Sequence, residues 1–175
     1  SLHDALPIYT SLALASCQGH ENIVRFLVES DVNINVRNNA GQTPIMFASR
    51  WGYGNIVEFL AESGADLNAQ DKDGWTAIMY ASRHGHEDIV LLLAEMGADP
   101  CIRNCCEETA LTSAFNNEHV PIVEYLAFLM IPNPNMSYSD MPISLFIGSE
   151  NNSNREAYFA LALKLIPDYM NRAVR

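Results

Sequence analysis

The chain is short of basic residues and of long apolar runs. It has 10 Lys and Arg against 21 Asp and Glu, which gives a formal net charge of −11 over 175 residues. Proteins that bind a nucleic-acid backbone use clustered basic residues, so we expect no nucleic-acid partner. The apolar runs, such as Ile89–Ala94, fall far below the ~20 residues that span a bilayer, so we expect no membrane insertion.

The cysteines fit a reduced chain better than a disulfide scaffold. The four cysteines, Cys17, Cys101, Cys105 and Cys106, include no Cys-x-x-Cys pair. This usage is typical of a reduced protein inside the cell. We therefore expect an intracellular, cytoplasmic location, and we expect a monomer.

Residues 1–8, which read SLHDALPI, differ in character from the rest of the chain. They lack an initiator Met and look like translated sequencing-adaptor read-through. They also lack the basic region and apolar stretch of a signal peptide. We expect residues 1–8 to be a non-native N-terminal segment.

Internal repetition is the dominant feature of the remaining sequence. A threonine, an alanine and an Ile-Val pair each recur at a spacing of 33 residues. A fixed period of this length is typical of repeat proteins, in which each unit buries its apolar face against its neighbours. The recurring residues are Thr10, Thr43, Thr76 and Thr109; Ala15, Ala48, Ala81 and Ala114; and the pairs that begin at Ile23, Ile56, Ile89 and Ile122.

Each unit is predicted to contain two short helices. In the third unit the first helix should follow Thr76, whose hydroxyl can cap free backbone N–H groups. It should span residues 77–84 and end at Gly85, which can adopt the left-handed conformation. The second helix is expected over residues 86–96. The residues expected on its buried face are Ile89, Leu92 and Leu93.

The stretches NNAGQTPIMFASRWGYGNIVEFLAESGADLNAQ and DKDGWTAIMYASRHGHEDIVLLLAEMGADP resemble ankyrin repeats, and the resemblance covers residues 9 to about 130. It implies an all-α ankyrin-repeat solenoid of helix-turn-helix units with β-turn or hairpin tips. One departure recurs, because Met46 and Met79 replace the histidine that the family carries after Thr-Pro-Leu. The family's Thr–His hydrogen bond cannot form there, so we expect slightly looser inner helices in an intact fold.

The resemblance divides the chain into four repeats and a C-terminal cap. The fourth repeat is the weakest, because Glu107 replaces the turn glycine and Pro121 stands early in the second helix. Residues 131–140 are rich in Pro, Asn and Ser and are predicted to form a loop. The expected repeats span 9–40, 41–73, 74–106 and 107–130, and residues 141–175 are expected to form a degenerate fifth repeat that caps the stack as an irregular helical segment.

The stretch SRHGHEDIV, residues 82–90, superficially suggests a metal site. However, His86 occupies the same repeat position as His20 and His119, and neighbouring repeats are about 8–10 Å apart. Metal ligands all lie ~2 Å from one ion, so these histidines cannot share a metal. Catalytic motifs such as Gly-x-Ser-x-Gly and the phosphate loop are missing from the sequence. We expect no enzyme activity, no metal and no cofactor.

The resemblance implies that a partner protein binds at the turn tips and at the exposed ends of the first helices, which together form a concave face. The candidate partner-binding residues are Gln42, Arg50, Trp51, Lys72, Asp73, Trp75, Arg83, His84, Glu108, Asn116 and Asn117, with Tyr9, Cys17, Gln18 and Cys105 as further members of the row.

Trp51 and Trp75 are the only tryptophans, and Arg50 and Arg83 occupy equivalent positions in a chain poor in basic residues. Trp and Arg are enriched at binding hot spots. The hypothesis is a Trp/Arg patch that binds an acidic or amphipathic segment of another protein. The alternative is that each Trp packs on a neighbouring turn and each Arg pairs with a local acid.

Two other functions stay open on the sequence alone. The chain could be the regulatory or targeting segment of a larger multidomain enzyme. It could instead be a metal- or redox-responsive module built on His84 and His86 or on Cys101, Cys105 and Cys106.

Overall fold

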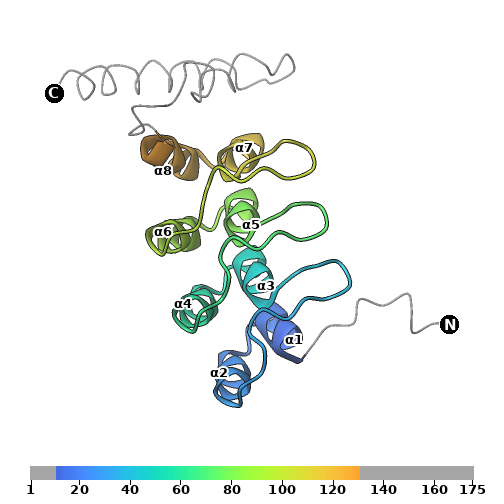
Figure 1. Cartoon of the computed structure of the whole chain (residues 1–175). Coiled ribbons are helices and arrows are strands. Elements are labelled where there is room, and N and C mark those ends of the chain that lie inside the picture. Colours follow the sequence, from blue (N-terminus) through green and yellow to red (C-terminus); the bar gives the residue numbers. More distant parts are fainter. Residues whose placement is uncertain (1–10, 131–175) are drawn as a thin grey trace. The chain divides into compact units, whose positions relative to one another are not determined.

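The structure of the chain, a computed structural model, describes residues 11–130 apart from the side chains of Phe128 and Met130, and eight helices lie in that range (Figure 1). The helices are α1 (Ser11–Gln18), α2 (Glu21–Glu29), α3 (Pro44–Trp51), α4 (Gly54–Glu62), α5 (Ala77–His84), α6 (Glu87–Glu95), α7 (Ala110–Asn116) and α8 (Val120–Met130). None of the described residues is in a β-strand. The predictions for residues 1–8, Tyr9, the loop 131–140 and the cap 141–175 lie outside the described residues.

By compactness the chain falls into two units, residues 1–122 and 123–175. The first unit holds α1 to α7 and the start of α8. In the second unit the described residues are those of α8 from Val123 onward, among which Val123, Leu126 and Ala127 are buried. Every helix in the described part of the chain falls short of the length and apolarity that crossing a membrane requires.

Within the first unit the helices form two adjacent rows. Figure 1 shows α1, α3, α5 and α7 in one row and α2, α4 and α6 in a second row. Each helix contacts the next one in its own row, and each of α1 to α6 contacts the other helix of its own repeat. The long turns between repeats project from the first row, on the side away from the second. This all-α stack confirms the fold class that the 33-residue period predicts.

The caps of α5 lie where the sequence places them. Thr76 precedes the helix in an extended conformation, and its Oγ1 accepts a hydrogen bond from the Met79 N–H at 3.4 Å. Gly85 ends the helix in the left-handed conformation, with φ of 76°. A Cβ atom at this glycine would lie 2.6 Å from the ring of His119 in the next repeat. Glycine is therefore required both by the turn and by the close approach of its neighbour.

The buried face of α6 is wider than the sequence predicts. Ile89 and Leu93 are buried as expected, but Leu92 is only half-buried and Val90 is fully buried. The reason is that α6 packs against both α5 and α4, so its buried stripe faces two neighbours.

Small residues in the first helices allow the repeats to pack closely. Ala48, Ala81 and Ala114 are each 0 % exposed, at equivalent positions of α3, α5 and α7. Cβ atoms of this size let adjacent helices pack without voids. The methionines that replace the family's histidine are also buried, and the Thr43 N–H donates to the sulfur of Met46 at 3.4 Å.

Candidate functional site

The turns that lead into α3, α5 and α7 are each closed by one side chain. The Oδ1 atom of Asp71 accepts hydrogen bonds from the N–H groups of Asp73 and Trp75, at 3.0 and 2.8 Å. Asn38 and Asn104 make the equivalent pairs of bonds in the other two turns. An Asp or Asn side chain that replaces a backbone acceptor in this way fixes a turn without a strand. The residues beside it are thereby held in place.

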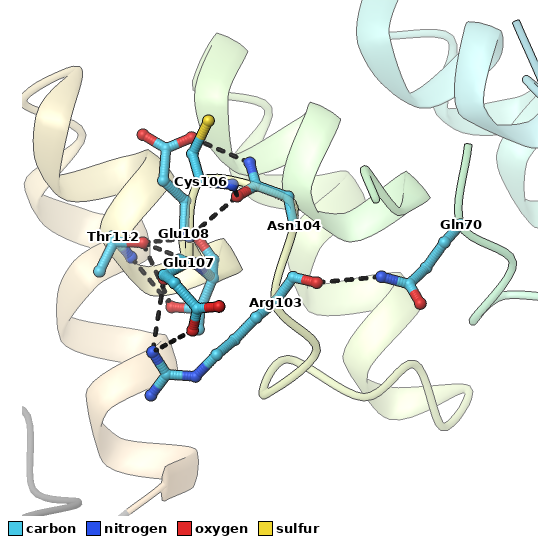
Figure 2. Close-up of polar contacts among 8 residues, drawn as sticks. Gln70, Arg103, Asn104, Cys106, Glu107, Glu108 and Thr112 are labelled. Carbon is cyan, nitrogen blue, oxygen red and sulfur yellow. Dashed lines mark hydrogen bonds and ion pairs between the residues drawn. The ribbon is translucent and has the colours of Figure 1, made fainter. Parts of the chain in front are cut away.

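Neighbouring turns are linked to each other through backbone and side-chain bonds. The Lys72 N–H donates to the carbonyl of Ala40, and the Cys105 N–H donates to the carbonyl of Asp73, both at 2.9 Å. Figure 2 shows a further link, in which the Gln70 side chain donates to the Arg103 carbonyl at 3.0 Å. These bonds connect successive turns into one continuous surface.

The side chains beside these turns form an arginine–aromatic cluster, defined here as Arg50, Trp51, Trp75, Tyr80 and Arg83. The Arg50 guanidinium lies 5.6 Å from the centre of the Trp51 ring and 5.8 Å from that of Tyr80. Tyr80 and Trp75 have ring centres 5.3 Å apart. The Arg83 guanidinium lies 5.0 Å from the Trp75 ring. The cluster therefore joins α3 to α5 through cation–π and aromatic contacts.

Tyr80 is the centre of the cluster. Its hydroxyl donates to Asp71 Oδ2 at 2.7 Å and accepts from the Gln42 side chain at 3.0 Å. Burial, and then the hydrogen bond to Asp71, raise the pKa of Tyr80 to about 12. The ring of Tyr80 is thus held neutral and fixed between Arg50 and Trp75.

Neither arginine of the cluster is neutralised by an ion pair within residues 11–130. Among residues 11–130, the ion pairs are Arg25 with Glu21 and Arg103 with Glu107, and neither Arg50 nor Arg83 takes part in one. The Nε atom of Arg50 is also buried with no hydrogen-bond partner. The alternative interpretation from the sequence, in which each arginine pairs with a local acid, does not describe this surface.

The cluster lies next to a group of histidines. Burial, and then the positive charges of Arg50, His86, Arg83 and His119, lower the pKa of His84. The rings of His84 and His86 lie 6.3 Å apart. Two arginines thus act on His84, although the chain as a whole is strongly acidic.

The recurring histidines link one repeat to the next. His86 Nε2 lies 3.1 Å from the carbonyl oxygen of Arg50, and His119 Nε2 lies 3.1 Å from that of Arg83. These contacts give the recurring histidines His86 and His119 a structural role between repeats. Over the described range, no three His, Cys, Asp or Glu side chains are arranged to hold a metal ion.

The remaining sequence candidates lie apart from the cluster. Lys72 and Asp73 are exposed at the tip of the third turn. Glu108 accepts hydrogen bonds from Asn104 and Asn116, which gives the fourth repeat a separate polar group. Asn117 donates to the Ser113 carbonyl at the end of α7. Cys17 is half-buried on α1, and Gln18 is exposed beside it.

The thiols of the fourth turn are exposed but not activated. Cys105 and Cys106 have sulfur atoms 3.8 Å apart. The hydrogen bond to Cys106 raises the pKa of the Cys105 thiol, and burial raises that of Cys101. Reactive cysteines have lowered pKa values, so these shifts disfavour a redox-responsive module.

Sequence reasoning missed Tyr80 and Asp71, which organise the site. The equivalent residues to Tyr80 in the other repeats are Leu14, Phe47 and Ser113. A tyrosine in a largely apolar column carries a hydroxyl that needs a partner. The need of the Tyr80 hydroxyl for a partner could have indicated the contact. The acceptor is Asp71, the acidic residue of the preceding turn.

Comparison with known proteins agrees with this arrangement. A family model described as ankyrin repeats, in three copies, matches residues 3–71 and residues 64–140. A search of curated proteins found no match. Because the matched residues cover most of the chain and include all of the stacked helix pairs, the chain belongs to the ankyrin-repeat family.

Proposed function

We propose that this chain is a protein-binding module, acting by recognition rather than catalysis, and that the arginine–aromatic cluster holds an acidic or amphipathic segment of its partner. The family to which the chain belongs generally mediates protein–protein interaction. The observation that carries the proposal is the pair of arginines, Arg50 and Arg83, stacked on aromatic rings and outside the ion pairs of residues 11–130.

Charge and composition both support this surface as the point of contact. Arg and Trp are enriched among residues that dominate binding energy. A guanidinium stacked on an aromatic face keeps its N–H groups available for a carboxylate. Trp51 is 53 % exposed and flanks Arg50, so it offers apolar area beside the charge. The exposed thiols, which a reducing compartment would keep free, support an intracellular location.

The test compares the parent chain with two double variants. Arg50→Ala/Arg83→Ala removes the proposed contacts, and Arg25→Ala/Arg103→Ala removes the same charge from arginines in exposed ion pairs elsewhere. Arginine variants are preferable to Trp75→Ala because Trp75 is half-buried against Tyr80. All three proteins should first show the same helicity and the same urea midpoint.

Each protein is then immobilised, and the lysate proteins that it retains are quantified by mass spectrometry. We expect at least one protein to be retained by the parent and by the Arg25→Ala/Arg103→Ala control but lost from the Arg50→Ala/Arg83→Ala variant. Equal retention by all three proteins would contradict a role for the cluster in binding.

A further inference from the structure

Arg50 and Arg83 form a pair with a defined separation. They occupy equivalent positions, 33 residues apart, near the ends of α3 and α5, and these helices pack against each other. Packed helices lie about 8–10 Å apart. The backbone positions of the two arginines are therefore expected at about that interval. A ligand that uses both arginines must carry two acceptors with a matching separation.

The two arginines are supported by different rings, because Trp51 follows Arg50 in α3, whereas Trp75 lies in the turn before α5. The guanidinium of Arg50 stands over Trp51 at 5.6 Å, and that of Arg83 stands over Trp75 at 5.0 Å. Stacking uses the face of the guanidinium, and because the Nε atom of Arg50 is buried, this arginine would meet a carboxylate through its terminal amino groups. The cluster therefore offers a ligand two guanidinium groups, each beside a tryptophan.

The separation discriminates among the backbone conformations of a peptide. In a polyproline II helix, residues i and i+3 lie on one side and about 9 Å apart. In a β-strand, residues i and i+2 share a face but are separated by only about 7 Å. Grooves lined with aromatic side chains are a known mode of recognition for the polyproline II conformation.

We propose that the arginine–aromatic cluster binds an extended acidic segment in the polyproline II conformation, with carboxylates at positions i and i+3 on Arg50 and Arg83. This inference rests on the proposed function, because it assigns a ligand to the same surface. The tryptophans contact the residues between the two acids. Arg50 and Arg83, in a chain whose net charge is −11, supply the positive charge that attracts an acidic segment.

The test uses synthetic peptides and so does not depend on finding the natural partner. Four fluorescein-labelled peptides of equal length are compared by fluorescence anisotropy at low salt. The first three share a proline-rich background, with two Glu at i and i+3, two Glu at i and i+2, or two Gln at i and i+3. The fourth is an alanine-rich helix with two Glu at i and i+7, whose separation is about 10 Å.

We expect the proline-rich i, i+3 peptide to bind at least ~10-fold more tightly than the i, i+2 and Gln peptides, because only it engages both guanidinium groups. Arg83→Lys keeps the charge but loses two parallel hydrogen bonds. The variant should bind the i, i+3 peptide more weakly and should no longer prefer the i, i+3 spacing to the i, i+2 spacing. Arg103→Lys, outside the cluster, should change neither the affinity for the i, i+3 peptide nor the preference for its spacing.

Equal affinity for the two spacings, tighter binding of the helical peptide, or no binding of any peptide would overturn the inference. These outcomes are distinct from a failure of the proposed function. If a cellular protein is lost from Arg50→Ala/Arg83→Ala while the peptides show no spacing preference, the binding surface stands and the ligand assignment falls.

Discussion

The third and fourth repeats share one backbone plan but present different chemistry. In both, a buried polar residue, Asp71 or Asn104, closes the turn through the same two hydrogen bonds. In both, a threonine Oγ accepts a hydrogen bond from the backbone N–H three residues later and so caps the first helix. The positions that make these bonds hardly vary between the repeats, because the backbone groups that they pair with are the same.

Other equivalent positions differ between the two repeats. Where the third repeat has Trp75, Tyr80 and Arg83, the fourth has Glu108, Ser113 and Asn116. The first set forms the arginine–aromatic cluster, and the second forms a hydrogen-bonded polar pair. The comparison separates positions that the fold requires from positions that are free to carry function.

The largest expected effect is at a position that both repeats share. Ala81→Asp should lower the free energy of unfolding by at least ~3 kcal/mol, because the new carboxylate would be buried without a partner. Ala114→Asp should cost a similar amount, since both alanines are 0 % exposed. Urea denaturation followed by circular dichroism measures both.

The control is His84→Asp, which adds the same group at an exposed position of α5 and should cost less than ~1 kcal/mol. If Ala81→Asp were as mild as this control, the repeats would not be packed as described.

The next largest loss of stability is expected when the glycine of the third turn is replaced by a residue with a side chain. Gly74→Ala should destabilise the chain by about 2 kcal/mol, because φ is +82° and the new Cβ would lie 2.7 Å from the Asn104 Cα. Gly64 also has positive φ, +91°, but has open space around it. Gly64→Ala should therefore cost only about 1 kcal/mol. Equal losses in urea denaturation would show that the contact with the fourth turn contributes nothing.

The dependence of stability on high pH should report the ionisation of Tyr80, a tyrosine that the fourth repeat replaces with Ser113. The pKa of Tyr80 is raised to about 12 in the folded chain, from an ordinary value of 10.0. The unfolded chain therefore ionises first, and the stabilisation is complete below pH 10 and is lost as the pH rises towards 12. We expect a loss of about 1–2 kcal/mol over this range.

Tyr80→Phe is the control for this titration. It should be less stable than the parent near neutral pH, because Asp71 loses a hydrogen bond, but it should lack this part of the loss at high pH. Parallel stability curves for the parent and the variant between pH 10 and 12 would contradict the assignment.

The smallest expected effect is an increase in the free energy of unfolding. Glu107 has φ of 60°, a left-handed conformation that non-glycine residues adopt at a cost, whereas the third repeat has Gly74 at this position. Glu107→Gly should raise the free energy of unfolding by about 1 kcal/mol. Its exposed ion pair with Arg103, at 3.5 Å, contributes little that would be lost. An unchanged or lower urea midpoint would show that the fourth turn is not strained.

Several elements of this fold could be predicted from the sequence because they depend on local or periodic signals. Thr76 and Gly85 bound α5 where the capping rules place them, since caps depend on residues within one turn of the helix. The recurrence of His86 at His20 and His119 argued against a shared metal, but it did not predict the contact with the Arg50 carbonyl. The buried face of α6 was predicted only in part, because it depends on two neighbouring helices.

The sequence by itself determined the 33-residue period, the helix pairs and the presence of tryptophan and arginine at positions that the repeat leaves free. The tertiary structure alone decided that Tyr80 would lie between Arg50 and Trp75, with its hydroxyl on Asp71. It also decided that Arg50 and Arg83 would stack on rings instead of pairing with acids. The physical reason is that Arg50 and Tyr80 belong to different repeats, and the geometry of their contact is set by how helices pack.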